Sequence, residues 1–323
     1  MQVFGNTVRF CVQATTSRHS FGEYLANWLT CERLGYDVAY ATDHFVSYSP
    51  ERGASSVFEG PTLLSAMAAH TSRMRCGLMV ASNTFRNPGV LAKIAVTLDH
   101  VSGGRLELGM GSGHIQIEHE QYNVPFYTQA ERIRMLGESA KIVRSLLTQE
   151  RTTSEGQYYR FKDALCEPKP VQPSLPILIG GIGEELSLRV VAESADIWNN
   201  WTSPDLDTYQ RKLRALQRHC DDLGRNPADI RKSMHIKPLV GETEAELRER
   251  APEQPRNRWQ GTPEELTELL LEFVKLGVGD FVFMLDEPAD LRSLELIATK
   301  VAPEVRDRGA RLLAEAPAAS TSG

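Results

Sequence analysis

The chain has 323 residues, of which 41% are hydrophobic and 24% charged, and its formal net charge is −6. This composition is typical of a globular protein, and no apolar run approaches the roughly 20 residues that a membrane span needs. The negative balance and the absence of a Lys/Arg block disfavour a nucleic-acid partner, because phosphate neutralisation needs a concentrated basic face.

The cysteines and the N-terminal segment indicate the compartment. The five cysteines are scattered and form no C-x-x-C pair, which argues against a disulfide framework and a zinc site and predicts buried thiols. The opening stretch MQVFGNTVRFCVQ lacks the charged region, apolar stretch and cleavage site of a signal peptide. We therefore expect a cytoplasmic protein without a bound metal.

Apolar strand-like runs alternate with helical segments along the chain, which is the pattern of β-α units. Eight strands are expected, at residues 8–12, 37–42, 75–80, 105–110, 176–180, 196–199, 233–239 and 280–285. Helices are expected between them, at 21–33, 61–70, 88–101, 129–147, 184–192, 206–223 and 263–275. Eight such repeats predict an α/β fold, a TIM-like (β/α)8 barrel with insertions, and an open doubly wound sheet is the alternative.

The barrel is expected to form a single domain over residues 1–310. The segment TTSEGQYYRF predicts a hairpin insertion at about 151–164, between a long helix and the next strand. Residues 311–323, which include EAPAASTSG, are expected to form a flexible tail.

Several strand ends carry residues suited to a binding site. Gly109, Gly111 and Gly113 alternate at the end of one strand, which indicates close approach of the backbone to a ligand or, as the alternative, a bulge. The carboxyl ends of barrel strands face one mouth, so polar residues and glycines from different strands are expected to converge. These are Asp43, His44, Ser82, Asn83 and Gly180 to Gly183.

Two of these strand ends have a specific chemical interpretation. Asp43 and His44 follow an apolar strand, where an imidazole can exchange a proton with a bound molecule, although a surface turn is the simpler alternative. Ile179–Gly183 leads into a helix whose free N–H groups could hold a phosphate, although a plain turn is again possible. The spacing does not match the dinucleotide fingerprint, which disfavours a Rossmann nicotinamide site.

Four longer blocks carry a family resemblance. They are DHF at 43–45, NTFRNPGVLAKIAVTLDHVSGGRLELGMGSG at 83–113, EHEQYNVPF at 118–126 and CEPKPVQPSLPILIGGIGE at 166–184. In order and spacing they resemble the bacterial luciferase-like monooxygenase superfamily, most closely its deazaflavin (coenzyme F420)-dependent oxidoreductases, from Val8 to about Val301. The resemblance implies a TIM-like barrel with an insertion, usually dimeric, that holds a flavin or deazaflavin ring at its C-terminal mouth.

The resemblance also implies which residues contact the cofactor. In the family, a non-prolyl cis peptide lies under the ring, and here it would join Met79 and Val80. Asp43 would bind the pyrimidine region of the ring or orient its neighbour. The other implied contacts are Ser82 and Asn83 at the polar edge of the ring, and Gly180, Gly181, Ile182 and Gly183 around the phosphate.

His44 is the leading catalytic candidate, because the resemblance places it near the hydride-bearing carbon. His114 stands where relatives carry a tryptophan or a proton-transferring glutamate, so it is a second catalytic candidate, a wall of the pocket or a solvated residue of the loop. Structural roles are expected for Glu118 and His119. Asn199, Asn200 and Trp201 are expected to form a substrate-specific wall, and the absence of a basic residue at 202–204 disfavours a sugar-phosphate dehydrogenase.

The implied function is hydride transfer between coenzyme F420 and a small to medium organic substrate. One alternative is a two-component monooxygenase that uses reduced flavin mononucleotide (FMN) and dioxygen in a dry pocket. The others are a non-catalytic flavin-binding barrel and a coenzyme-free lyase or isomerase. We expect a homodimer served by a reductase that supplies the reduced cofactor, with no nucleic-acid or membrane partner.

Overall fold

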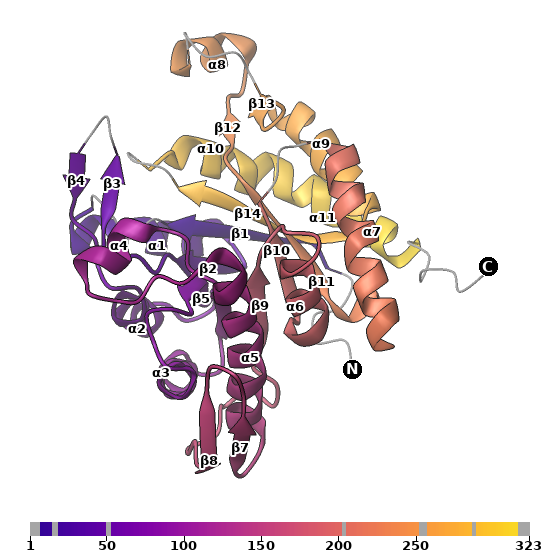
Figure 1. Ribbon diagram of the computed structural model, residues 1–323. Helices are drawn as coiled ribbons and strands as arrows, with labels where there is room; N and C mark the ends of the chain where they lie inside the picture. The colour runs from indigo at the N-terminus through magenta and orange to yellow at the C-terminus, as the bar shows by residue number, and fades with distance from the viewer. Residues whose placement is uncertain are drawn as a thin grey trace.

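The fold is a closed barrel of parallel strands (Figure 1). The computed structural model describes residues 7–14, 19–49, 53–201, 205–251, 257–285 and 289–315. The barrel strands lie in the order β1 (Arg9–Ala14), β14 (Val278–Leu285), β11 (Arg231–Ile236), β10 (Ile197–Asn200), β9 (Ile177–Gly180), β6 (Leu106–Gly111), β5 (Arg75–Ser82) and β2 (Val38–Ala41). The predicted TIM-like (β/α)8 barrel is thus confirmed, and the open sheet is excluded.

Helices surround the barrel (Figure 1). They are α1 (Phe21–Leu34), α2 (Gly60–His70), α3 (Pro88–Ser102), α5 (Gln129–Thr148), α6 (Ser187–Ser194), α7 (Leu206–Leu223) and α9 (Pro263–Lys275). Sequence signals set several of their starts: Ser20, Thr128 and Thr262 each form a capping box with the glutamate three residues later. Such boxes satisfy two backbone N–H groups that the first turn leaves open.

The C-terminal region is more helical than the sequence pattern indicates. After β14, helix α10 (Leu291–Leu296), a π-helical segment (Ile297–Val301) and α11 (Ala302–Glu315) follow one another, and α11 packs on α9. Helix α11 therefore continues through 311–315, which lie in the segment expected to be a flexible tail. The rest of that segment, 316–323, lies outside the described residues.

The insertions occur at both ends of the barrel. The pair β3 (Ser47–Ser49) and β4 (Gly53–Ser55), the helix α4 (Gln116–Gln121) and the group β12 (Leu239–Val240), α8 (Glu244–Arg250) and β13 (Gln260–Gly261) follow strands β2, β6 and β11. All three extend the carboxyl ends of these strands, and the first two supply Ser47, Ile117 and Glu118 to the lining of the mouth. The antiparallel hairpin of β7 (Thr152–Glu155) and β8 (Arg160–Ala164) follows α5 at the opposite end (Figure 1). Its turn reaches back along the outside of the barrel to Asn83, after β5.

The amino end of the barrel is filled by a buried ionic cluster. Glu107 accepts hydrogen bonds from Arg9 (2.6 Å), Arg75 (2.7 Å) and the hydroxyl of Tyr40 (2.5 Å), and Arg9 also binds Asp280. Burial alone would raise the pKa of Glu107, but Arg9 and Arg75 lower it to about 2. Because each buried charge has a partner of opposite sign, this polar core is tolerated.

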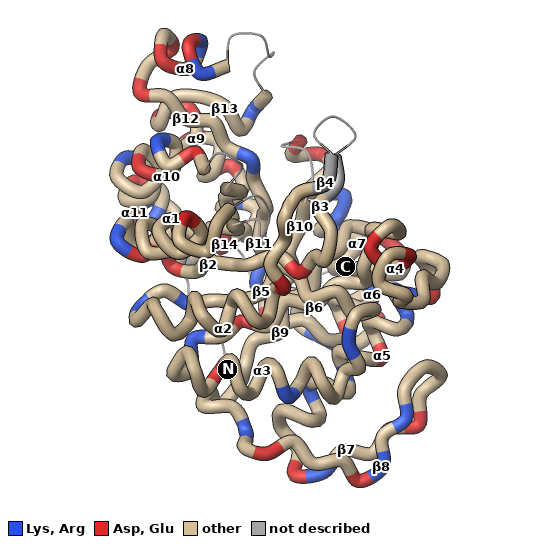
Figure 2. Tube along the Cα trace, turned by 90° about the vertical axis from the view of Figure 1, so that its left-hand side faces the viewer, with Lys and Arg blue, Asp and Glu red and all other residues tan. Residues whose placement is uncertain are grey.

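Outside the barrel, acidic and basic residues are interleaved along α8, α11 and the β7–β8 hairpin (Figure 2). The five cysteines, Cys11, Cys31, Cys76, Cys166 and Cys220, are buried free thiols. Of the helices in the described ranges, none is long and apolar enough to cross a membrane.

Candidate active site

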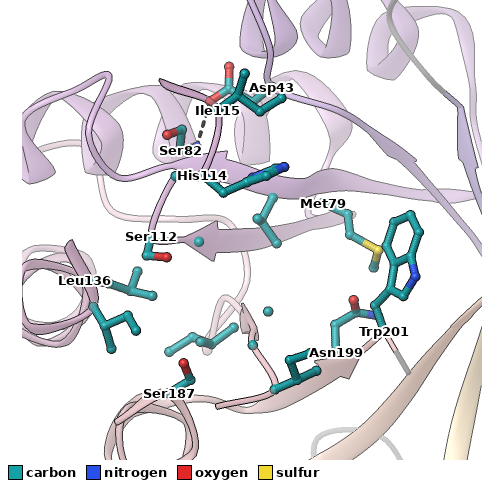
Figure 3. A pocket seen from close by; sticks show the side chains of 18 of the residues that line it. Asp43, Met79, Ser82, Ser112, His114, Ile115, Leu136, Ser187, Asn199 and Trp201 are labelled. Atoms are coloured by element: carbon teal, nitrogen blue, oxygen red, sulfur yellow. Dashed lines mark hydrogen bonds between the residues drawn. The ribbon is translucent and has the colours of Figure 1, made fainter. Parts of the chain in front are cut away.

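A cavity of about 1350 Å³ opens at the carboxyl ends of the barrel strands (Figure 3). Pockets for a single small molecule typically measure about 300–1,000 Å³, so this cavity has room for a coenzyme and a second molecule. The predicted site residues that line it are Asp43, His44, Met79, Val80, Ser82, His114, Gly180, Gly181, Ile182 and Gly183. The expected convergence of the strand ends is therefore present.

A bulge in β5 forms the floor of this cavity. The pairing of β5 with β6 shifts register between Leu78 and Ala81, and the Met79–Val80 peptide bond is cis, where the resemblance places it. Gln13 of β1 donates its side-chain N–H to the Met79 carbonyl oxygen at 2.7 Å. The bulge therefore presents Met79 and Val80 to the cavity, and Gln13 of β1, which lies beyond β2 in the barrel, holds it there.

The bulge explains the alternating glycines of β6. A Cβ atom at Gly109 would lie 1.9 Å from the backbone oxygen of Leu78, and one at Gly111 would lie 2.3 Å from Cγ2 of Val80. Both distances are impossible for real side chains. The glycine pattern predicted either a closely approaching ligand or a bulge. The adjacent bulge in β5 is sufficient to explain Gly109 and Gly111.

His44 is oriented by a buried carboxylate. Its Nδ1 lies 3.1 Å from Oε2 of Glu118, and Oε1 of the same carboxylate accepts the backbone N–H groups of Phe45 (2.8 Å) and Val46 (3.1 Å). Burial opposes ionisation of Glu118, but the bond with His44 and these N–H groups lower its pKa below the usual range. Glu118, expected to anchor its loop, thus holds both the loop after β2 and the imidazole.

His114 stands beside His44 on the same wall. The two ring centroids are 5.8 Å apart with the rings nearly perpendicular, and His114 projects into the cavity (Figure 3). Burial, followed by the neighbouring charge of His44, lowers the pKa of His114 below its usual value. His114 is consequently neutral at pH 7, with one nitrogen able to donate and the other able to accept.

Asp43 is engaged within the protein. Its carboxylate accepts the backbone N–H of Ser82 at 3.0 Å and two bonds from the guanidinium of Arg86 at 2.6 and 3.0 Å. Burial raises its pKa, while Arg86 acts in the opposite direction. Of the two roles expected for Asp43, this geometry favours orienting its neighbours, because it ties the end of β2 to the end of β5.

Asn83 was expected to contact the polar edge of the ring, but it does not line the cavity. Strand β5 ends at Ser82 and the chain turns, so the side-chain amide of Asn83 donates instead to the hydroxyl of Tyr159 at 3.2 Å. His119 is structural as expected: its ring nitrogens bind the Ile115 carbonyl (2.7 Å) and the Thr84 hydroxyl (2.7 Å).

The glycine loop after β9 folds closely over the start of α6. A Cβ atom at Gly181 would lie 2.9 Å from Cβ of Ser187, and one at Gly183 would lie 3.1 Å from its Oγ. The N-cap residue Leu186 provides no side-chain hydrogen bond, so the first turn of α6 has N–H groups without a side-chain cap beside the cavity. Such a turn suits an anionic group.

Several lining residues were not predicted from the sequence: Gln13, Ser112, Ser187, His235 and Met284. His235 carries a signal that could have revealed it, because β11 ends at Ile236 and the histidine stands at a strand end like His44. The expected wall residues Asn199 and Trp201 line the cavity, whereas Asn200 does not. Residues 202–204, on which the sugar-phosphate argument depended, lie outside the described residues.

Comparison with known proteins identifies related sequences. A family model described as luciferase-like monooxygenase matches residues 3–275. An uncharacterized protein of Mycobacterium tuberculosis is 35% identical over 176 residues, which cover 54% of this chain and only 61% of that relative. F420-dependent glucose-6-phosphate dehydrogenase from Segniliparus rotundus is 27% identical over 333 residues, covering 93% of this chain and 98% of the relative.

Solved structures share the fold at lower sequence identity. An F420-dependent secondary alcohol dehydrogenase in complex with an F420-acetone adduct has a TM-score of 0.79 at 17% identity, covering 93% of this chain and 100% of the other. A long-chain alkane monooxygenase has a TM-score of 0.78 at 16% identity, covering 94% and 92%. At this identity the likeness establishes the barrel fold alone.

Proposed function

The chain belongs to the luciferase-like monooxygenase family, and from this premise we propose that it is a coenzyme F420-dependent oxidoreductase acting on a small to medium organic substrate. The observation that carries the proposal is the pair of His44 and buried Glu118 beside His114, next to the bulge at Met79 and Val80. The F420-dependent relatives support the choice of coenzyme.

The cavity fits a flat ring with a phosphorylated side chain. Val80 faces Gly111 of β6 and Gly180 of β9, so neither of these two positions places a side chain over the bulge. The first turn of α6, which has no side-chain cap, would hold the phosphate, with Ser187 as a further donor. Glu184 also lines this end, but Arg211 (3.0 Å) and Lys212 (2.9 Å) neutralise its charge.

When bound, the deazaflavin would supply two-electron chemistry by donating or accepting a hydride. The chain's own residues then transfer the proton that accompanies the hydride. Glu118 accepts the Nδ1–H of His44, which fixes the tautomer and the orientation of the imidazole. Nε2 of His44 is thereby the atom that exchanges a proton with the substrate oxygen, and neutral His114 is placed to hydrogen-bond that oxygen or to relay the proton.

A two-component FMN monooxygenase is the second candidate, because the same bulge and mouth would accept an isoalloxazine ring. Apolar side chains of Ile115, Ile133 and Leu136 line part of the cavity, as a water-excluding pocket requires. The His44–Glu118 pair favours the hydride-transfer proposal, since it provides the acid or base that reduction of a carbonyl or oxidation of an alcohol needs.

The deciding experiment is a binding titration of the coenzyme-free protein with reduced F420 and, separately, with reduced FMN. We expect tight binding of F420 that is lost in Gly180→Val, because the new side chain would enter the cavity beside Val80. Gly22→Val is the matched control, since a Cβ atom at Gly22 of α1 would meet no neighbouring atom within 4 Å. Preference for FMN with oxygen uptake would support the monooxygenase, and binding of neither would support a coenzyme-free or non-catalytic barrel.

We also propose that the protein is a homodimer and that a separate reductase supplies its reduced coenzyme. Sedimentation velocity of the purified chain tests the first, and a coupled assay with a flavin or F420 reductase tests the second. A cytoplasmic location stays a prediction.

A further inference from the structure

The end of the cavity away from the start of α6 is lined by aromatic, thioether and neutral polar groups. They are Met79, Asn199, Trp201, His235 and Met284. Figure 3 shows Trp201, Asn199 and Met79 together on one side of the cavity, opposite Ser187 and Leu136. If the coenzyme phosphate lies at the first turn of α6, as the proposed function requires, this opposite end remains for the substrate.

Trp201 is the exposed aromatic group of this end. It is 59% exposed although it lines the cavity, whereas Trp28, Trp198 and Trp259 are buried. Its ring meets the imidazole of His235 at a centroid distance of 4.5 Å and an interplanar angle of 85°. This edge-to-face contact fixes the indole while leaving much of its surface open to a ligand.

His235 contributes no charge to this end. It is only 5% exposed, and burial lowers its pKa to about 4. Its Nε2 is buried and has no hydrogen-bond partner within the part of the chain that the structure describes. A neutral imidazole here packs as an aromatic ring against Trp201 and offers no cation to an anionic substrate.

In the described part of the chain, the cavity as a whole also offers no cationic side chain to an anionic substrate. No lysine or arginine occurs among the described residues that line it. Its acidic residues are Asp43, Glu118, Glu184 and Glu185. The first three are paired with Arg86, His44 and Lys212 respectively. A phosphate or carboxylate at the Trp201 end would therefore find no cationic partner in the described cavity lining, which favours an uncharged ligand there.

We propose that the substrate is an uncharged aromatic ketone or the corresponding alcohol, whose ring system stacks on Trp201, with His235 as a positioning residue that holds the indole. The inference rests on the proposed function. In the reducing direction, the carbonyl carbon gains a hydride and its oxygen gains a proton from His44. The substrate thereby gains two electrons, and reduced coenzyme F420 is the reductant.

The test is a matched pair of ligands that differ in charge. We would measure binding of 2-acetylnaphthalene and of 2-naphthoate to the full chain by calorimetry, without coenzyme and with oxidised F420, and would include glucose 6-phosphate as an anionic sugar. We expect the ketone to bind at least about tenfold more tightly than either anion. Equal or tighter binding of 2-naphthoate or glucose 6-phosphate would overturn the proposal.

Two pairs of variants test the named residues. Trp201→Ala is expected to weaken ketone binding about tenfold and Trp201→Phe to retain most of it, because aromatic stacking contributes on this order. His235→Ala is expected to weaken ketone binding and His235→Phe to restore it, while the affinity for F420 stays unchanged in both. Unchanged ketone binding in Trp201→Ala, or failure of His235→Phe to restore it, would refute the assigned roles.

The two proposals fail in distinguishable ways. Ketone binding that depends on Trp201, without any binding of F420, would overturn the proposed coenzyme and leave the substrate class standing. Tight binding of F420 without preference for the ketone would overturn the substrate class alone.

Discussion

Replacing Glu107 by glutamine tests the buried cluster at the amino end of the barrel. The pKa of Glu107 falls from an ordinary 4.5 to about 2. At 1.36 kcal/mol per pKa unit, this shift corresponds to about 3 kcal/mol of stabilisation from the ionised carboxylate at pH 7. We predict that Glu107→Gln lowers the free energy of unfolding by about this amount or more, since Arg9 and Arg75 also lose their countercharge.

The pH dependence gives the sharper test. Because the folded-state pKa lies below the unfolded one, the stabilisation is fully present above about pH 5 and is lost as the pH falls toward 2. The difference in the free energy of unfolding between wild type and Glu107→Gln should therefore shrink to roughly 1 kcal/mol at pH 3. Guanidinium chloride unfolding of both proteins at pH 7 and pH 3 measures this difference in unfolding free energy.

The control for this experiment is Glu268→Gln, which removes an exposed partner of Arg308. Exposed pairs contribute little, so this variant should unfold like the wild type at both pH values. A difference between wild type and Glu107→Gln that is the same at pH 3 as at pH 7 would show that the ionised carboxylate is not the source of the stabilisation.

Three further predictions concern the site. Glu118→Gln should slow hydride transfer about 10- to 100-fold in stopped-flow absorbance without changing coenzyme affinity, because the amide keeps the loop contacts but not the charge facing His44; an unchanged rate would contradict this role. If His114 transfers a proton, the acid limb of kcat against pH should lie below pH 6.5 and should disappear in His114→Gln, since the pKa of His114 is lowered; a limb that survives in the variant assigns it to another group. Gly111→Ala should destabilise the protein by about 1–3 kcal/mol in thermal unfolding and weaken coenzyme binding, because the new methyl group overlaps Val80; Gly22→Ala is the control, and equal behaviour of the two would refute the steric argument.

The barrel and its mouth could be predicted from local sequence signals. Each strand is an apolar run, each helix has a periodic apolar face, and several helix starts have capping residues. Once the fold is a barrel, Asp43, His44 and the loop from Gly180 must meet at one end. The pairing of His44 with Glu118 could not be predicted from the sequence, because His44 follows β2 whereas Glu118 lies in α4, which follows β6.

Other features depend on tertiary neighbours. Gly109 and Gly111 suggest a ligand or a bulge equally well, and only the position of β5 decides between them. Asn83 was expected in the cavity because it follows a strand, but the turn at residues 83–85 takes its side chain to Tyr159. The neutral state of His235 arises from burial, which a single sequence does not reveal.

The contact between Val80 and Gly111 also constrains how this barrel can change over evolutionary time. An alanine at 111 would meet a side-chain methyl group, so a smaller residue at 80 would make room for it first. A larger residue at position 109 cannot be accommodated in this way, because it would overlap the backbone oxygen of Leu78, which no side-chain replacement removes. Homologous sequences should thus show paired substitutions at 80 and 111, with the reduction at 80 preceding the enlargement at 111, while glycine at 109 persists.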